Sequence, residues 1–157
     1  MIRRATPNDA PAIVAIWNHA IRETTITFNP VEKTEAEVAN VINDATPCYV
    51  YETENTVQGF ARYFPFRGGE GYRFSVEHTV MLTKVAQGTG VGRALMAVLC
   101  DDAKAAGMHM MHAGISAENP KAVDFHIKCG FTTLAVLPEV GFKFGRWIDL
   151  VLMQKRV

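Results

Sequence analysis

A glycine-rich segment near the middle of the chain constrains the fold more than any other feature. Residues 87–93 read QGTGVGR and lie between an alternating stretch that ends at Leu82 and a helical pattern over residues 93–106. Glycines let a backbone approach a ligand closely, and the unpaired N–H groups and dipole of a helix start attract phosphate. The segment therefore predicts a strand, a turn and a helix whose N-terminus binds a phosphate or pyrophosphate.

Two common nucleotide motifs are excluded at this segment. The dinucleotide fingerprint requires Gly-x-Gly-x-x-Gly, but after Gly88 and Gly90 the third position holds Arg93. The chain has no Gly-Lys-Ser/Thr sequence that would mark a P-loop. The glycines must serve a different kind of phosphate site.

Charge and length favour a single globular domain that binds a small molecule. The chain has 157 residues, with 16 Lys and Arg against 16 Asp and Glu, so no general basic field predicts a nucleic-acid partner. The N-terminal apolar stretch over residues 12–17 is too short for a signal peptide or membrane span. We expect one domain over residues 1–157, a cytoplasmic location, and neither a nucleic-acid nor a membrane partner.

Apolar periodicity predicts alternating helices and strands. Four helices are expected, one after an Asn8 or Asp9 cap, one after a Thr34 cap with Glu37 completing a capping box, and two over residues 93–106 and 120–128. Strands are expected over residues 49–52, 57–64, 72–82, 108–115, 131–137 and 147–153.

The longest predicted strand, residues 72–82, carries a polar row. One face alternates through Phe74, Val76, His78, Val80 and Leu82, and the other through Arg73, Ser75, Glu77, Thr79 and Met81. Burying such a polar row without partners would cost several kcal/mol. The row is therefore expected either to face water or to line a site.

Two motifs resemble the GNAT superfamily of acetyl-CoA-dependent N-acetyltransferases. The first is Gln87-x-x-Gly90-x-Gly92, and the second is the stretch from Asn119 through His126 to Gly130-Phe131. The resemblance, together with the order of elements, implies an α/β (α+β) GNAT fold. This fold has a mixed, mostly antiparallel central sheet of about seven strands, flanked by about four helices.

Three further stretches are similar to the phosphinothricin and methionine sulfoximine acetyltransferase branch. They are residues 17–19 (WNH) with 24–28 (TTITF), residues 76–80 (VEHTV), and residues 140–149 (VGFKFGRWID). The resemblance implies transfer of acetyl from acetyl-CoA to the α-amine of a small amino acid such as phosphinothricin, methionine sulfoximine or methionine sulfone.

The resemblance also implies which residues hold acetyl-CoA. The pantetheine arm is expected beside the end of the long strand, the pyrophosphate on the glycine turn, and an asparagine on the arm. The corresponding residues are Val80, Met81, Leu82, Gln87, Gly88, Thr89, Gly90, Val91, Gly92, Arg93 and Asn119.

Acetyl transfer requires a base, because an amino-acid amine is mostly protonated at neutral pH. Glu77 is the candidate, since it lies on the polar row three residues before the expected pantetheine contact and matches the glutamate of the branch. The competing interpretation is a structural ion pair between Glu77 and Arg73. His126 stands where many superfamily members have a tyrosine acid, so it is a candidate general acid, a packing residue or a contact to coenzyme A.

Arg73 is the best anchor for an anionic group of the acceptor, because a guanidinium grips carboxylate or phosphinate with paired hydrogen bonds. A surface charge is its alternative interpretation. With the branch, the acceptor pocket is expected to involve Phe28, Arg73, Ser75, Glu77, Thr79, Lys143, Phe144 and Arg146, partly across a homodimer interface. His109 and His112 should point to opposite strand faces, so no metal site is predicted.

Direct transfer in a ternary complex fits better than an acyl-enzyme, because none of the three cysteines lies on the Glu77 face. Two other functions stay open from the sequence. One is acetylation of another amine, such as a peptide N-terminus or a polyamine. The other is a catalytically silent acyl-CoA sensor.

Overall fold

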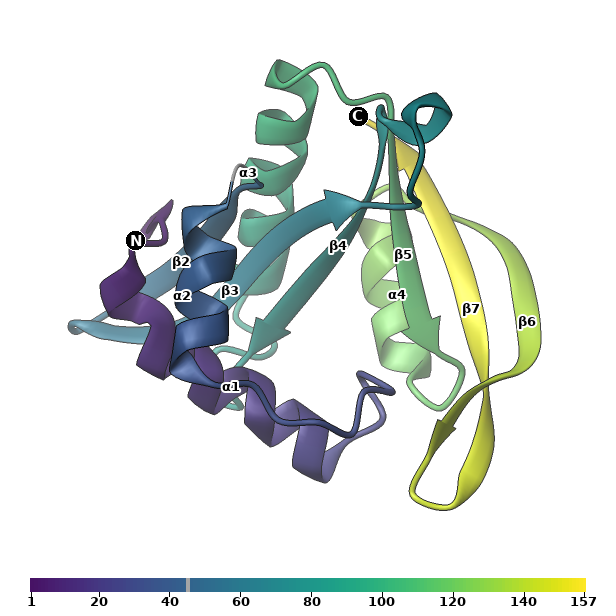
Figure 1. Ribbon diagram of the computed structural model, residues 1–157, viewed down its shortest axis with the longest axis horizontal. Coiled ribbons are helices and arrows are strands. Elements are labelled where there is room, and N and C mark those ends of the chain that lie inside the picture. Colours follow the sequence, from purple (N-terminus) through teal and green to yellow (C-terminus); the bar gives the residue numbers. More distant parts are fainter. Residues whose placement is uncertain (45) are drawn as a thin grey trace.

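The computed structural model describes residues 1–44 and 46–157, and its centre is one seven-stranded sheet (Figure 1). The strand order is β1-β2-β3-β4-β5-β7-β6. The strands are β1 (Ile2–Arg4), β2 (Cys48–Thr53), β3 (Thr56–Pro65), β4 (Ser75–Leu82), β5 (Met110–Ser116), β6 (Thr132–Lys143) and β7 (Arg146–Arg156). The α-helices are α1 (Ala10–Glu23), α2 (Glu35–Asn43), α3 (Val91–Ala105) and α4 (Pro120–Lys128).

The helices cover the two faces of the sheet in pairs. Helices α1 and α2 lie against one face, and α3 and α4 lie against the other (Figure 1). Ile13, Val38 and Phe60 are buried in the core under α1 and α2, whereas Leu95 and Met111 are buried in the core under α3. Successive residues of one strand point to opposite faces, so on β3 Phe60 packs in one core and its neighbour Ala61 in the other.

Local sequence signals explain two of the helix starts. The Thr34 hydroxyl accepts a hydrogen bond from the Glu37 N–H at 3.2 Å, and the Glu37 carboxylate accepts one from the Thr34 N–H at 2.7 Å. This reciprocal capping box confirms the expected start of α2. At α4 the side-chain oxygen of Asn119 accepts from the Ala122 N–H at 3.2 Å.

The sheet opens between β4 and β5. These two strands run parallel but pair only from Ser75 with Met110 to Glu77 with His112. On its other edge β4 pairs with β3 over Val76–Leu82, and β5 pairs with β7 over its whole length. Backbone groups of residues 78–82 that point toward β5 therefore have no strand partner, and Figure 1 shows the two strands diverging.

Several predicted boundaries differ from the structure. The strand expected from Tyr72 begins at Ser75, because a 3₁₀ turn (η2, Glu70–Tyr72) precedes it and Arg73 ends that turn in a helical conformation. The strand expected over residues 131–137 continues to Lys143, so residues 138–143, which lie between two predicted strands, belong to β6. Strand β1 was not predicted at all, and at three residues it is too short for periodicity to reveal.

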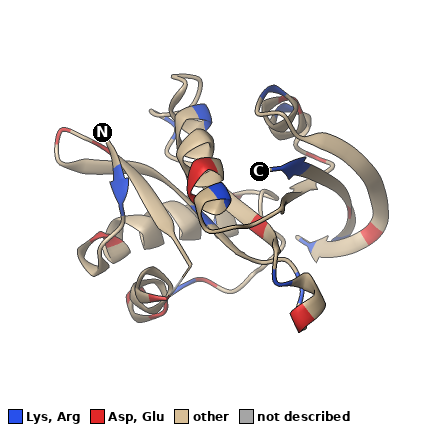
Figure 2. Cartoon of the chain, turned by 90° about the horizontal axis from the view of Figure 1, so that it is seen from above, with Lys and Arg blue, Asp and Glu red and all other residues tan. Residues whose placement is uncertain are grey.

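Charged residues of both signs are distributed along the chain (Figure 2). Within residues 1–44 and 46–157 no three His, Cys, Asp or Glu side chains gather as metal ligands would. None of the helices in the same ranges combines the length and the apolar character needed to cross a membrane.

Candidate active site

Glu77 lies at the point where the sheet opens. It is the last residue of β4 that pairs with β5, and its side chain projects on the face that α1 covers, as the Met81 side chain does. A Cβ atom added to Gly114 of β5 would stand 3.1 Å from Glu77 Oε1. The carboxylate therefore reaches across the opening toward β5, over a residue that has no side chain.

The Glu77 carboxylate has no hydrogen bond or ion pair with any residue that the structure describes. Burial raises its pKa above the usual glutamate value of 4.5. The expected alternative, an ion pair with Arg73, is not formed, since Arg73 contacts Glu70 instead, at 3.4 Å. A half-buried carboxylate without partners can accept a proton from a bound ligand.

His126 lies on the opposite face of the sheet from the Glu77 side chain. It is buried, its Nδ1 is 2.6 Å from the Ala122 carbonyl oxygen, and its Nε2 is 3.1 Å from Nε2 of His78. Burial lowers the pKa of both imidazoles, that of His78 to about 3. Glu77 and His126 therefore approach the opening from different sides of β4.

The glycine turn has the conformation expected of an anion site. Gly88 and Gly90 have φ angles of +76° and +88°, which L side chains rarely adopt. Gly90 is the N-cap of α3, and the first helical hydrogen bond runs from the Ala94 N–H to its carbonyl at 3.1 Å. The N–H groups of the first turn, residues 91–93, precede that bond, so they are oriented to bind an anion.

At the end of β4, beside the glycine turn, the side chains pack in the cores, so the backbone is what a ligand there could contact. Val80 and Leu82 pack against the core under α3, while Met81 is buried on the α1 side. Gln87 donates to the Leu82 carbonyl at 3.4 Å, which ties the turn to β4. Gly92 packs so closely that an added Cβ would be 3.2 Å from Leu82 and Phe125. The start of α3, the end of β4 and helix α4 thus meet at one place.

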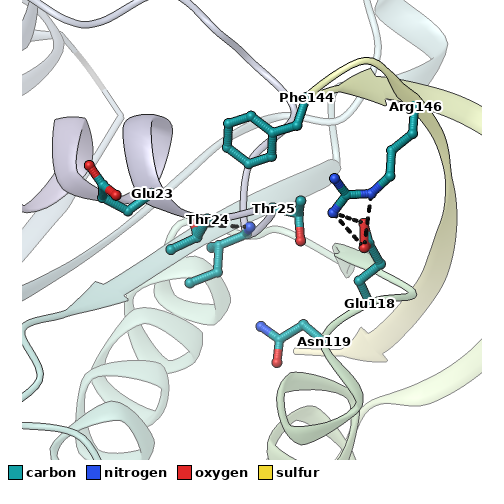
Figure 3. Close-up of a pocket in the computed structure, with 8 residues that line it drawn as sticks. Glu23, Thr24, Thr25, Glu118, Asn119, Phe144 and Arg146 are labelled. Carbon is teal, nitrogen blue, oxygen red and sulfur yellow. Dashed lines mark hydrogen bonds and ion pairs between the residues drawn. The ribbon is translucent and has the colours of Figure 1, made fainter.

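A cavity of about 320 Å³ lies between the end of α1, the β5–α4 loop and the β6–β7 turn (Figure 3). In the wall of this cavity the Arg146 guanidinium donates to the Glu118 carboxylate at 2.7 Å, and Figure 3 shows Asn119 and Phe144 near this pair. The lining residues are Glu23, Thr24, Thr25, Ile26, Glu118, Asn119, Phe144 and Arg146. The structure therefore brings the predicted residues Asn119, Phe144 and Arg146 together.

Lys143 and Phe28 do not line this cavity but hold the loop after α1, which does. Lys143 is 4% exposed, and its amine donates to the carbonyls of Thr24 and Thr27 at 2.6 and 2.7 Å. The Phe28 ring packs on the backbone of Gly141, where an added Cβ would be 2.5 Å away. Both residues attach the loop after α1 to strand β6.

The other expected acceptor residues are dispersed. Ser75 and Thr79 flank Glu77 on the same strand face and are half-buried. Arg73 lies outside β4, in the turn after η2, and its exposed guanidinium contacts the Glu70 carbonyl and carboxylate. Neither Arg73 nor Glu77 lines the 320 Å³ cavity.

Two residues at this site escaped the sequence interpretation. Gly114 gives room for the Glu77 carboxylate, and no local pattern around a single strand glycine indicates that. His78 contacts His126, and here a signal existed, because a histidine in an otherwise apolar strand row requires a buried partner.

Known proteins resemble this chain over almost its full length. The acetyltransferase (GNAT) domain family matches residues 2–152. An L-methionine sulfoximine/L-methionine sulfone acetyltransferase of Salmonella typhimurium is 37% identical over 98% of this chain and 92% of its own length. A phosphinothricin N-acetyltransferase of Alcaligenes faecalis is 35% identical over 98% of this chain and 81% of its own length.

Solved structures agree with the sheet and helices described above. A ribosomal-protein-alanine N-acetyltransferase of Brucella melitensis is 39% identical with a TM-score of 0.95, covering 100% of this chain and 99% of its own. A Salmonella typhimurium acetyltransferase solved with acetyl-CoA is 36% identical with a TM-score of 0.96, covering 99% of this chain and 92% of its own. The expected fold is confirmed, and the chain belongs to the GNAT family of N-acetyltransferases.

Proposed function

We propose that this protein transfers the acetyl group of acetyl-CoA to the α-amine of a small amino acid in a ternary complex, with Glu77 as general base. The acceptors are methionine sulfoximine, methionine sulfone, phosphinothricin or a close analogue. The observation that carries the proposal is the Glu77 carboxylate, unpartnered among the described residues at the opening of the sheet. The names of relatives at 35 and 37% identity support the acceptor class.

In this proposal acetyl-CoA occupies the opening between β4 and β5. Its pyrophosphate binds the N–H groups of the glycine turn and α3 start, over residues 87–93, and the amides of its pantetheine arm pair with the free edge of residues 80–82. Asn119 stands at the α4 end of the opening. The bound acetyl-CoA of a structure with TM-score 0.96 supports this ligand.

The chemical step balances with one protein base. The α-ammonium gives a proton to Glu77, directly or through water, and the freed nitrogen attacks the thioester carbonyl carbon. Backbone N–H groups at the β4 edge stabilise the resulting oxyanion. The carbon–sulfur bond then breaks, the sulfur leaves with the electron pair as thiolate, and the remaining excess proton on nitrogen passes to solvent.

The acceptor is proposed to lie between the Glu77 row and the 320 Å³ cavity. Ser75 and Thr79 would flank its amine, and Phe144 and Arg146 would line the far side. Lys143 and Phe28 would shape the pocket through the contacts that hold the loop after α1. Arg73 stays a predicted anchor, and binding would require it to leave Glu70.

The first test is release of thiol from acetyl-CoA by the purified protein with a panel of amines. The panel comprises methionine sulfoximine, methionine sulfone, phosphinothricin, common amino acids, spermidine and a peptide that begins with alanine. Selective turnover of the first three supports the proposal. The peptide represents a second candidate, favoured by the name of the Brucella relative, and turnover of it alone would replace the proposed acceptor.

Glu77→Gln tests the base. The variant should lose about 10²- to 10⁴-fold in kcat while it still binds acetyl-CoA, because general base catalysis contributes that range. Glu35→Gln is the matched control, since Glu35 is an exposed carboxylate at the start of α2, away from the proposed site. Unchanged turnover in Glu77→Gln would exclude Glu77 as the base. Acetyl-CoA binding without turnover of any amine would favour the sensor alternative.

A further inference from the structure

The proton positions on the His126 ring follow from its two contacts. Nδ1 lies 2.6 Å from the Ala122 carbonyl oxygen, and a carbonyl oxygen can only accept. Nδ1 therefore carries the hydrogen. A neutral imidazole has one N–H, so Nε2 of neutral His126 presents a lone pair.

The contact with His78 then determines the second ring. The two Nε2 atoms are 3.1 Å apart, and one of them must donate. Because Nε2 of His126 presents a lone pair, His78 carries its proton on Nε2, and its Nδ1 is left as an acceptor. His78 Nδ1 is indeed a buried atom without a hydrogen-bond partner among the described residues.

This arrangement leaves His126 without a proton to give from Nε2. Adding one would set two N–H groups against each other at 3.1 Å. Relief would require the His78 proton to move to Nδ1, where a buried donor would lack an acceptor. Burial also lowers the pKa of both rings, which keeps them neutral at pH 7.

The two histidines connect strand β4 to helix α4 beside the opening of the sheet. His78 follows Glu77 directly, in the part of β4 that no longer pairs with β5, whereas His126 lies on α4. Phe131 packs edge-on against both rings, at 5.5 and 5.3 Å between ring centroids. The imidazole contact thus joins β4 to α4 at the point where β4 no longer pairs with β5.

We propose that His78 and His126 form a positioning pair that holds the Glu77 segment of β4 against α4, and that the coenzyme A thiolate leaves without a proton from His126. The inference rests on the proposed function, because it concerns the same acetyl transfer. A thiolate is a stable leaving group at neutral pH, so departure without an acid is chemically feasible.

Two substitutions at His126 separate positioning from acid catalysis. The side-chain amide that His126→Gln introduces keeps an oxygen that accepts from His78 Nε2–H but has no ionisable proton, whereas His126→Leu removes the acceptor. We expect His126→Gln to stay within about threefold of the unchanged enzyme in kcat with the same pH profile, and His126→Leu to lose roughly tenfold or more in kcat. His109→Gln, at an exposed histidine, is the control.

Loss of activity in both His126 variants would point to acid catalysis instead. A general acid contributes about 10²- to 10⁴-fold, so an equal loss of that size in both His126 variants, with KM unchanged, would assign the acid role to His126. Full activity in both variants would exclude a positioning role.

A second measurement needs no acceptor, so its failure is distinct from failure of the proposed function. Nitrogen-15 NMR of the imidazoles at pH 7, with and without acetyl-CoA, should find hydrogen on Nδ1 of His126 and on Nε2 of His78. Hydrogen on Nε2 of His126 at pH 7 would contradict the assignment, even if a His126 variant failed to fold.

Discussion

Glu77 is the residue at which function and stability oppose each other. Its carboxylate is half-buried and has no partner among the described residues, and burial raises its pKa. The folded protein thus holds this proton more tightly than the unfolded chain does. Stability therefore falls as pH rises from the unfolded pKa of 4.5 to the raised folded value.

Removing the charge should stabilise the protein. Glu77→Gln is expected to raise Tm at pH 7 relative to the unchanged protein, and the difference should vanish below about pH 4, where the carboxyl is protonated in both states. Thermal unfolding followed by circular dichroism at several pH values measures this. A lower Tm for the variant at pH 7 would mean that the folded protein stabilises the carboxylate.

Gly114 should control the placement of that carboxylate. A Cβ in Gly114→Ala would be 3.1 Å from Glu77 Oε1, a contact so tight that the carboxylate must shift by a few tenths of an ångström. Misplacement of a reacting group by about 1 Å can cost about 10²-fold, so we expect a loss of about tenfold in kcat with an unchanged Tm. Steady-state kinetics and thermal unfolding test this together, and an unchanged kcat would show that Glu77 tolerates displacement.

At the residue scale the sequence selected candidate residues but did not indicate what each contacts. Glu77 could be selected because strand alternation places it on a polar row. The contact of Arg73 with Glu70 could not be predicted in this way, because a 3₁₀ turn places Arg73 outside the strand and its polar row. Lys143 stays a predicted pocket residue, and only the fold shows that its amine donates to two carbonyls more than a hundred residues away in the sequence.

Among the elements, α3 and the turn before it depend most directly on glycine. Gly90 at the N-terminus has φ +88°, and Gly107 just beyond the C-terminus has φ +77°, and neither has an atom within 4 Å of an added Cβ. The two positions impose the same backbone strain at opposite ends of one helix.

This symmetry provides a controlled experiment. Gly90→Ala and Gly107→Ala should each lower the free energy of unfolding by about 1 kcal/mol, because L residues disfavour positive φ. Only Gly90→Ala should raise KM for acetyl-CoA, since it alters the turn proposed to bind pyrophosphate. Denaturant unfolding and kinetics measure both effects. An equal rise of KM in both variants would attribute the change to general destabilisation.

The caps of α2 and α4 were predictable, whereas the expected side-chain cap of α1 was wrong, since Asp9 stands at the N-cap but its carboxylate binds Arg3 and the Thr6 N–H. Strand ends were less predictable. Thr34 and Asn119 cap α2 and α4 as their sequences indicate, because capping is a contact between residues three apart. The end of β6 depends on pairing with β7, whose register shifts between Leu137 and Gly141. A register shift arises from two strands together and leaves no signal in either alone.

For the whole molecule we propose a homodimer formed through the β6–β7 hairpin. Large apolar side chains are exposed along it, and Trp147 reaches 63% exposure. The exposed residues are Leu134, Val136, Leu137, Val140, Phe142, Phe144 and Trp147. Several large apolar side chains exposed along one hairpin are typical of a protein interface.

Val136→Glu should convert the dimer to a monomer, because it places a charge in the proposed interface. Light scattering after gel filtration gives the mass. Val31→Glu is the matched control, since Val31 is an exposed valine in the loop between α1 and α2. A monomeric unchanged protein, or a dimeric Val136→Glu variant, would contradict the proposed interface.

The overall architecture was the most predictable level, and the opening in its sheet was the least. Four helices and six of the seven strands follow from apolar periodicity, and a mixed sheet of about seven strands follows from the family resemblance. The separation of β4 from β5 depends on which strands become neighbours, and no residue in β4 alone reveals that pairing stops at Glu77. The motifs predict where the site lies, while the geometry of the predicted residues required the fold.

The three-residue pairing of β4 with β5 leaves an interior edge of β4 without a strand partner, which a ligand could complete. A bound pantetheine arm would act as a short additional strand, so folding and binding become linked equilibria. A ligand at about 100 times its Kd stabilises a fold by about 2.7 kcal/mol, so the lifetime of this protein in a cell would follow the supply of acetyl-CoA. Such a molecule would persist when its co-substrate is abundant and be degraded faster when it is scarce.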